Sequence, residues 1–166
     1  MGPAYNALQW TAYFSAQVGA SAALTGLIFV AVSINLPNII AEAKLVSRSA
    51  KAILTLTGVL LESSFCLVPA QSGMALGLEL TVLGGVVWVL TTLLQIRSSH
   101  KNPYVSRGQK ILLGILTQVS GIPVWVAGIS LIVGAGGGLY WLLGATVACF
   151  LSALIDAWVL LIEIQR

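Results

Sequence analysis

The chain has 166 residues, of which 58% are hydrophobic and only 8% are charged, whereas soluble domains carry about 25% charged residues. So few polar residues cannot cover a globule of this size with a water-facing surface, which excludes a soluble globular protein. We therefore expect an all-α integral membrane protein that forms one domain over residues 1–166.

Charged residues divide the chain into long apolar windows. Residues 1–41 carry no charged side chain, residues 52–96 carry only Glu62 and Glu79, and residues 111–155 carry none. Each of the two later windows would make a helix of about 68 Å, roughly twice the thickness of the hydrocarbon core, and so must fold back once.

Turn residues place the ends of the helices. Pro37 and Pro69 interrupt apolar runs, and residues 134–138 are glycine apart from one alanine. Such residues end helices or make tight connections. We therefore predict five transmembrane helices, over about residues 10–36, 48–68, 73–96, 109–133 and 139–164.

Lysine and arginine predict the orientation. If the amino terminus is outside and the carboxyl terminus inside, all eight lysine and arginine residues fall on one side of the membrane. Three lie between the first two helices, four between the third and fourth, and one at the end of the chain: Lys44, Arg48 and Lys51; Arg97, Lys101, Arg107 and Lys110; and Arg166. The positive-inside rule makes that side cytoplasmic. The net charge of +3 is thus a topology signal, and we expect a multi-pass protein of the cytoplasmic (inner) membrane with the lipid bilayer as partner and no nucleic acid.

Small residues form a stripe at helical spacing along the expected first helix: Ser15, Gly19, Ala22, Gly26 and Ser33. Helices can approach one another closely along such a stripe. Because it offers more close-packing surface than one neighbour in a five-helix bundle uses, we expect a homo-oligomer, and contact with another membrane protein is the alternative.

The expected third and fourth helices each carry a mixed stripe of small and polar residues. These stripes have two interpretations, a packing seam between helices or the lining of a narrow polar path. Their members are Gly77, Thr81, Gly84, Trp88, Thr91 and Gln95 on the third helix, and Gly114, Gln118, Gly121, Trp125 and Gly128 on the fourth.

Two carboxylates, Glu62 and Glu79, lie inside the expected second and third helices. A charge in hydrocarbon costs between about 3 and over 10 kcal/mol, so such residues face protein or water and have partners. Since the two helices run antiparallel across a short connection, both side chains lie about 9 Å below the outer surface and can be neighbours. They either form a coupled pair that shares a proton, as in a proton or cation site, or are hydrogen-bonded carboxyls that hold the bundle together.

Asp156 is the third intramembrane carboxylate, about 10 Å above the cytoplasmic surface by helix rise. Gln118 of the fourth helix lies at a similar depth. The two side chains are expected to hydrogen-bond across the last helical hairpin, and the alternative is a cytoplasmic-side station of a proton or cation path.

Residues that would indicate catalysis or a cofactor are missing from the sequence. The lone histidine is His100, and Cys66 and Cys149 match neither a metal-binding spacing nor a redox motif. There is no Ser–His pair, zinc-protease motif or phosphate-binding loop. We therefore expect no enzyme, no cofactor and no metal.

Three segments resemble a family of small, mostly uncharacterised bacterial membrane proteins: GASAALTGLIFVAVSINL, the run that ends in LVPAQS, and LGLEL. Some members of that family are labelled as modulators of a membrane-anchored protease. The resemblance covers the first three expected helices and includes Gln71 and Glu79.

Two functions are compatible with these features. The first is an oligomeric channel or transporter-like protein for protons or small cations, with Glu62, Glu79, Asp156 and Gln118 on its path. The second is a non-conducting scaffold or regulator of another membrane protein, such as a membrane protease.

Overall fold

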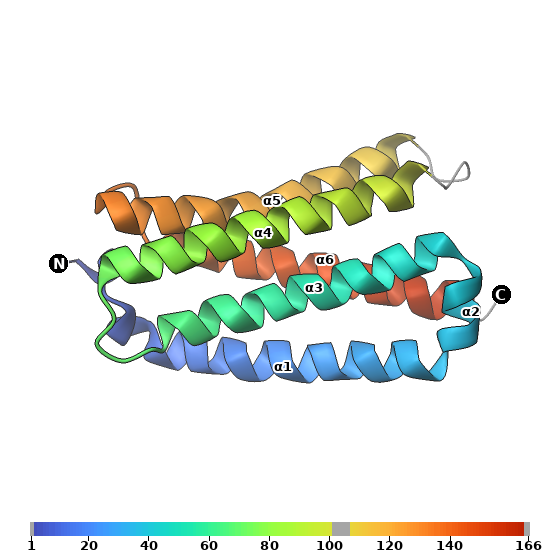
Figure 1. Ribbon diagram of the computed structural model, residues 1–166, viewed down its shortest axis with the longest axis horizontal. Coiled ribbons are helices and arrows are strands. Elements are labelled where there is room, and N and C mark those ends of the chain that lie inside the picture. The colour runs from blue at the N-terminus through green and yellow to red at the C-terminus, as the bar shows by residue number, and fades with distance from the viewer. Residues whose placement is uncertain (1, 101–106, 165–166) are drawn as a thin grey trace.

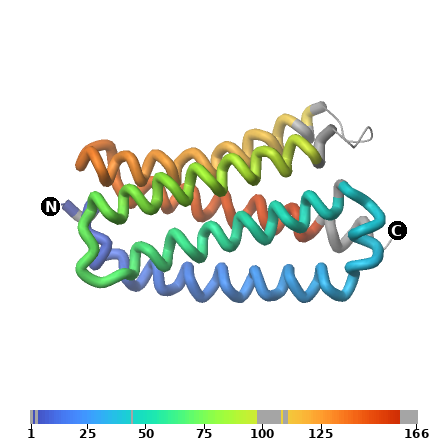
Figure 2. The backbone as a smooth tube through the Cα atoms, viewed as in Figure 1, coloured from blue at the N-terminus to red at the C-terminus, as the bar shows by residue number. Residues whose placement is uncertain are grey.

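The computed structural model describes residues 2–100 and 107–164, and these residues form helices joined by short connections, with no β-strand among them. The long helices lie side by side in one bundle, as Figures 1 and 2 show. The elements in chain order are η1 (Pro3–Tyr5), η2 (Ala7–Trp10), α1 (Thr11–Ile34), α2 (Leu36–Ala41), α3 (Ala43–Cys66), α4 (Gly73–His100), α5 (Arg107–Val133) and α6 (Tyr140–Ile164).

The five long helices run along one axis, so the bundle has two distinct ends (Figure 1). The segment of η1 and η2 lies at the same end as the α3–α4 and α5–α6 connections, and we call this the amino end; α2 lies at the opposite end, the α2 end. Helix α3 packs against α1, α4 and α6, and α5 packs against α4 and α6. Helix α1, by contrast, packs mainly on α3.

Four segments of the described chain are long and apolar enough to cross a membrane: Ala7–Ile34, Gly73–Arg97, Ile111–Val133 and Tyr140–Trp158. This confirms the expectation of a helical, multi-pass membrane protein. Helix α3 is not among the four, because charged and polar residues such as Lys51 and Glu62 interrupt its apolar run.

The predicted helix boundaries agree closely with the structure except around the first connection. Pro37 follows the end of α1 as predicted, but it lies in the first turn of the short α2, where a missing N–H costs nothing. Helix α3 begins at Ala43, five residues before the predicted start at residue 48. Lys44, Arg48 and Lys51 therefore all belong to α3, and their placement in the connection between the first two helices was wrong; Lys51 lies about two turns inside the helix.

The α5–α6 connection is tight, as predicted, and it holds the amino-terminal segment. Gly134, Gly136, Gly137 and Gly138 all have positive φ, which glycine adopts without strain. The N–H of Leu139 donates to the carbonyl of Ala4 at 2.8 Å, and the N–H of Gly137 donates to the Tyr5 hydroxyl at 3.1 Å.

Helices α4 and α5 have the most extensive contact of the helix pairs, and their mixed stripes face one another. A Cβ atom added at Gly77 would lie 2.8 Å from the carbonyl oxygen of Gly128, and one added at Gly121 would lie 2.6 Å from Cδ1 of Trp88. Glycine is needed at such contacts because any side chain would separate the helices. The packing interpretation of the two stripes is therefore confirmed at these positions.

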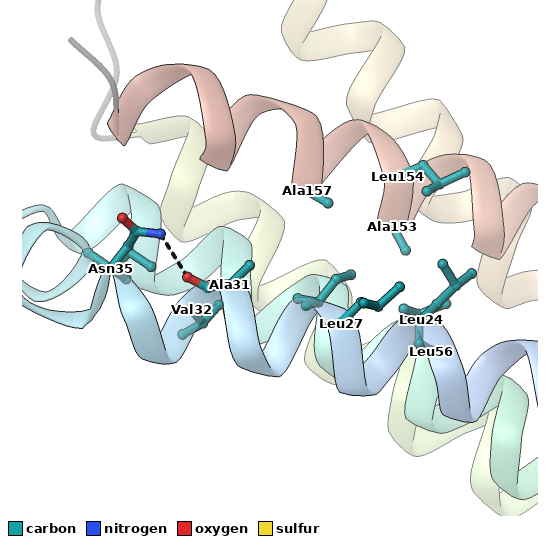
Figure 3. Close-up of a pocket in the computed structure, with 11 residues that line it drawn as sticks. Leu24, Leu27, Ala31, Val32, Asn35, Leu56, Ala153, Leu154 and Ala157 are labelled. Atoms are coloured by element: carbon teal, nitrogen blue, oxygen red, sulfur yellow. Dashed lines mark hydrogen bonds between the residues drawn. The ribbon is translucent and has the colours of Figure 1, made fainter.

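The small-residue stripe of α1 faces away from the bundle. Ser15, Gly19, Ala22, Gly26 and Ser33 are all exposed, and a Cβ atom at either glycine would meet no atom within 4 Å. Beside this stripe, an apolar groove of about 200 Å³ opens between α1 and α6 (Figure 3). One chain alone therefore leaves much of α1 without a protein neighbour.

Candidate functional site

A buried ion pair joins α3 to α6 in the interior of the bundle. Nζ of Lys51 lies 2.9 Å from Oδ2 of Asp156. The two residues are only 2% and 1% exposed, respectively. An ion pair this deep is costly to form unless the remaining hydrogen-bonding capacity of both groups is satisfied.

Two further helices satisfy the lysine. The Lys51 ammonium donates to Oε1 of Gln95 on α4 at 2.9 Å and to the hydroxyl of Thr117 on α5 at 3.4 Å. An ammonium has three N–H donors, so Asp156, Gln95 and Thr117 together can occupy all of them. Arg48, one turn before Lys51, also interacts electrostatically with Asp156. We call Lys51, Gln95, Thr117 and Asp156 the lysine cluster.

Sequence reasoning gave Asp156 the wrong partner. Gln118 instead accepts a hydrogen bond from Nε1 of Trp88 at 2.6 Å and donates to Thr92 at 3.4 Å, both on α4. The residue of α5 that reaches the lysine cluster is its neighbour Thr117, because adjacent helical residues point about 100° apart. Gln118 thus belongs to the α4–α5 seam.

Gln95 belongs to the mixed stripe predicted for the third helix, whereas Lys51 and Thr117 were not identified as candidate site residues from the sequence. The available signal was the polar stripe on one face of α3, where Lys51, Thr55, Glu62 and Cys66 recur at spacings of four and seven residues. All four are buried. A lysine on the same face as an intramembrane glutamate points into the bundle together with it.

Glu62 is buried in the half of the bundle nearer the amino end. It is 3% exposed, and its Oε1 atom has no hydrogen-bond partner in the described part of the chain. It interacts electrostatically with Tyr13 of α1, Cys66 of α3 and Cys149 of α6. A carboxyl oxygen in this position has lost its hydrogen bonds to water, and no protein donor among the described residues takes their place.

Glu79 has different surroundings. It is half-buried on α4, and the side-chain amide of Gln71, in the α3–α4 connection, donates to its Oε2 at 2.6 Å. No hydrogen bond joins the carboxyls of Glu62 and Glu79 within the described residues. The structure therefore gives Glu79 a hydrogen-bond partner that Glu62 does not share, and of the two only Glu62 is buried.

The buried side chains of the bundle can exchange protons and carry charge. Cys66 and Cys149 are free and buried. Across the described ranges, no group of three or more His, Cys, Asp or Glu side chains is placed to hold a metal ion. The buried groups that can carry or exchange charge are Lys51 and Glu62 on α3 and Asp156 on α6.

Comparisons of the chain with family models, curated proteins and solved structures gave no match. The resemblance carried by GASAALTGLIFVAVSINL, LVPAQS and LGLEL thus stays a prediction.

Proposed function

We propose that this chain is a five-span protein of the cytoplasmic membrane, with its amino terminus outside, that moves protons or small cations through the interior of its bundle. The observation that carries the proposal is the buried pair of Lys51 and Asp156, together with Glu62 on the same face of α3, whose Oε1 atom has no hydrogen-bond partner among the described residues. Five spans require that α3 crosses the membrane as well, shielded from lipid by its neighbours α1, α4 and α6.

The energetic cost of burying Lys51, Glu62 and Asp156 in a membrane supports a functional role for these three side chains. A charged side chain in the hydrocarbon region costs between about 3 and over 10 kcal/mol, and intramembrane ionisable residues commonly mark ion or proton pathways. A bundle that needed only stability would gain as much from apolar side chains of similar volume. Here three ionisable residues lie inside one four-helix contact region formed by α3 to α6.

Each charged group has a distinct role in this proposal. Asp156 binds the transported cation or proton, and Lys51 is the internal cation that holds the site when it is empty. When a proton or cation neutralises Asp156, Lys51 loses its ion-pair partner but keeps Gln95 and Thr117 as acceptors. Release of the cargo restores the pair, so the lysine returns the site to its starting state.

A proteoliposome assay tests the proposal. Purified protein is reconstituted in sealed vesicles, and fluxes of protons, Na⁺ and K⁺ are followed under an imposed membrane potential. We expect flux in the unaltered protein and a loss of about tenfold or more in Asp156→Asn, which keeps size and hydrogen bonding. Glu163→Gln, near the end of α6, is the matched control and should retain flux within about twofold.

Two outcomes contradict the proposal. The first is the absence of flux of all three ions in correctly assembled protein, measured beside vesicles that carry a known conducting protein. The second is a flux that Asp156→Asn leaves unchanged, which would place the path elsewhere.

A second function is favoured by a different observation, the exposed small-residue stripe of α1. In this alternative the chain is a non-conducting scaffold or regulator that binds another membrane protein, such as a membrane protease, through α1. The absence of flux, combined with loss of a cross-linked partner in Gly19→Leu, would support it.

A further inference from the structure

A small pocket lies next to Glu62 at the junction of four helices. Its volume is about 20 Å³. Side chains and backbone of all four inner helices line it, including Thr55, Gly58 and Glu62 of α3, Gly84 of α4, Ser120 of α5 and Cys149 of α6. A pocket above about 10–15 Å³ can hold one water molecule if two to four polar groups are there to bind it.

The polar groups around this pocket are arranged to accept hydrogen bonds from a water molecule. The Thr55 hydroxyl already donates to the Lys51 carbonyl at 2.8 Å, and the Ser120 hydroxyl donates to the Thr117 carbonyl at 2.9 Å. Each hydroxyl oxygen therefore keeps its lone pairs for another donor. Glu62 adds Oε1, which has no partner in the described residues.

A larger opening lies at the amino end, one helical turn beyond Glu62 on α3. A pocket of about 290 Å³ is bounded there by the amino-terminal segment and the α3–α4 connection, and its lining includes Asn6, Thr11, Cys66 and Gln71. We call it the outer vestibule. Cys66 follows Glu62 by one helical turn, which is about 6 Å along the axis.

On its other side the pocket leads toward the lysine cluster. Thr55 lines the pocket and is one turn from Lys51 on the same face of α3. Glu62 and Lys51 are three turns apart, about 16 Å along the helix. The outer vestibule, Glu62, the small pocket and the lysine cluster thus follow one another along a single helix face.

We propose that Glu62 and one water molecule in the small pocket bind and release the transported species, and that this species is a proton. This inference rests on the proposed function and specifies its cargo. The volume of about 20 Å³ excludes a hydrated Na⁺ or K⁺ ion. A bare cation would need a shell of about six or more oxygen ligands, as hard cations do in proteins, and the pocket offers far fewer side-chain oxygens.

The transfer balances without any redox partner. A hydronium ion in the outer vestibule gives a proton to a Glu62 carboxylate oxygen and leaves as water. The new O–H bond then breaks as the pocket water takes the proton, and that water passes one of its own protons toward the Asp156 carboxylate.

Glu62 is the suitable proton carrier among its titratable neighbours. Tyr13, Cys66 and Cys149 interact with it electrostatically from α1, α3 and α6, and Glu79 of α4 interacts with Cys66. Phenols and thiols ordinarily keep their protons near neutral pH, so they do not exchange them as carboxyls do. Glu79 is held by Gln71 outside the small pocket.

Two independent measurements test the inference. The first is infrared difference spectroscopy of the protein in vesicles, in which exchange from H₂O to D₂O shifts the band of a protonated carboxyl. We expect one such band to vanish in Glu62→Gln. The second is flux of protons against flux of Na⁺ and K⁺, in which only the proton flux should exceed that of empty vesicles.

A matched pair of variants on α3 isolates the pocket water. Thr55→Val removes a hydroxyl that lines the pocket while keeping the side-chain volume, and should lower proton flux several-fold. Thr57→Val makes the same change at a position outside the pocket lining and should retain flux within about twofold. Size-exclusion profiles of all variants establish that each is folded.

The outcomes separate this inference from the function on which it rests. Flux of Na⁺ or K⁺, or a proton flux that Glu62→Gln does not change, overturns the inference and leaves transport standing. Absence of every flux overturns the proposed function. In that case, proton exchange at Glu62 in the infrared spectrum would still support Glu62 as a proton-binding site, and the absence of proton exchange would overturn the binding site as well.

Discussion

Removing the charge of Lys51 should destabilise the bundle strongly. In Lys51→Met a side chain of similar length would leave Asp156, only 1% exposed, without its counter-ion. Breaking a buried pair by removing one partner costs about 3–5 kcal/mol, because the other charge is left uncompensated. Gln95 and Thr117 would each lose a hydrogen bond as well. We expect the free energy of unfolding to fall by about 3–5 kcal/mol.

The assay is equilibrium unfolding in mixed micelles with increasing sodium dodecyl sulfate, followed by circular dichroism. Lys51→Met, Asp156→Leu and the double variant complete a double-mutant cycle. Because the double variant has no buried charge at this site, it should be more stable than the sum of the single losses predicts, with a coupling energy of about 2 kcal/mol or more.

A matched control tests whether the loss of stability depends on the burial of the charge that is removed. Arg97→Met removes an exposed positive charge near the end of α4 and should change the unfolding free energy by less than about 0.5 kcal/mol. Strictly additive losses at positions 51 and 156, or a Lys51→Met loss no larger than that of Arg97→Met, would refute the assignment of a dry, mutually dependent ion pair.

Three further predictions concern topology, assembly and packing. In a background without the native cysteines, Pro3→Cys should react with an impermeant maleimide from outside and Pro103→Cys only from inside; equal reactivity from one side would exclude the proposed orientation. Gly19→Leu with Gly26→Leu should weaken a homo-oligomer seen by native mass measurement, since both glycines are exposed in one chain; a strictly monomeric unaltered protein would contradict this. Gly77→Ala should cost about 1–3 kcal/mol of unfolding free energy because its Cβ would lie 2.8 Å from a backbone oxygen, whereas Gly19→Ala should cost almost none; equal losses would argue against the tight α4–α5 contact.

The distribution of charges and turn residues was sufficient to predict most of the fold. Pro69 and the glycines after Val133 end helices because of backbone geometry, which acts locally and can be read from sequence. The start of α3 could not be read in the same way. Its first residues are polar enough to resemble a loop, so the basic residues there were counted with the connection, although the stripe that Lys51 shares with Glu62 indicated its burial.

The partners of the buried polar residues were harder to predict than their burial. Helix rise placed Gln118 and Asp156 at similar depths, but depth does not fix the direction in which a side chain points. Thr117 reaches Lys51 while Gln118 turns to Trp88. The rotation of each helix about its own axis depends on tertiary packing, such as the glycine contacts between α4 and α5, so pairings across helices require the structure.

The contact between the amino-terminal segment and the α5–α6 connection has a consequence for biosynthesis. Tyr5 and Gly137 are 132 residues apart in the chain, yet they are joined by a hydrogen bond. At a translation rate of 5–20 residues per second, roughly 7–26 s pass between the synthesis of the two partners. During that interval α1 has only α3 as a major helical neighbour. The α5–α6 connection therefore anchors the amino-terminal segment late in synthesis, and a nascent chain that stops after α5 lacks the two hydrogen bonds from Gly137 and Leu139 that hold this segment.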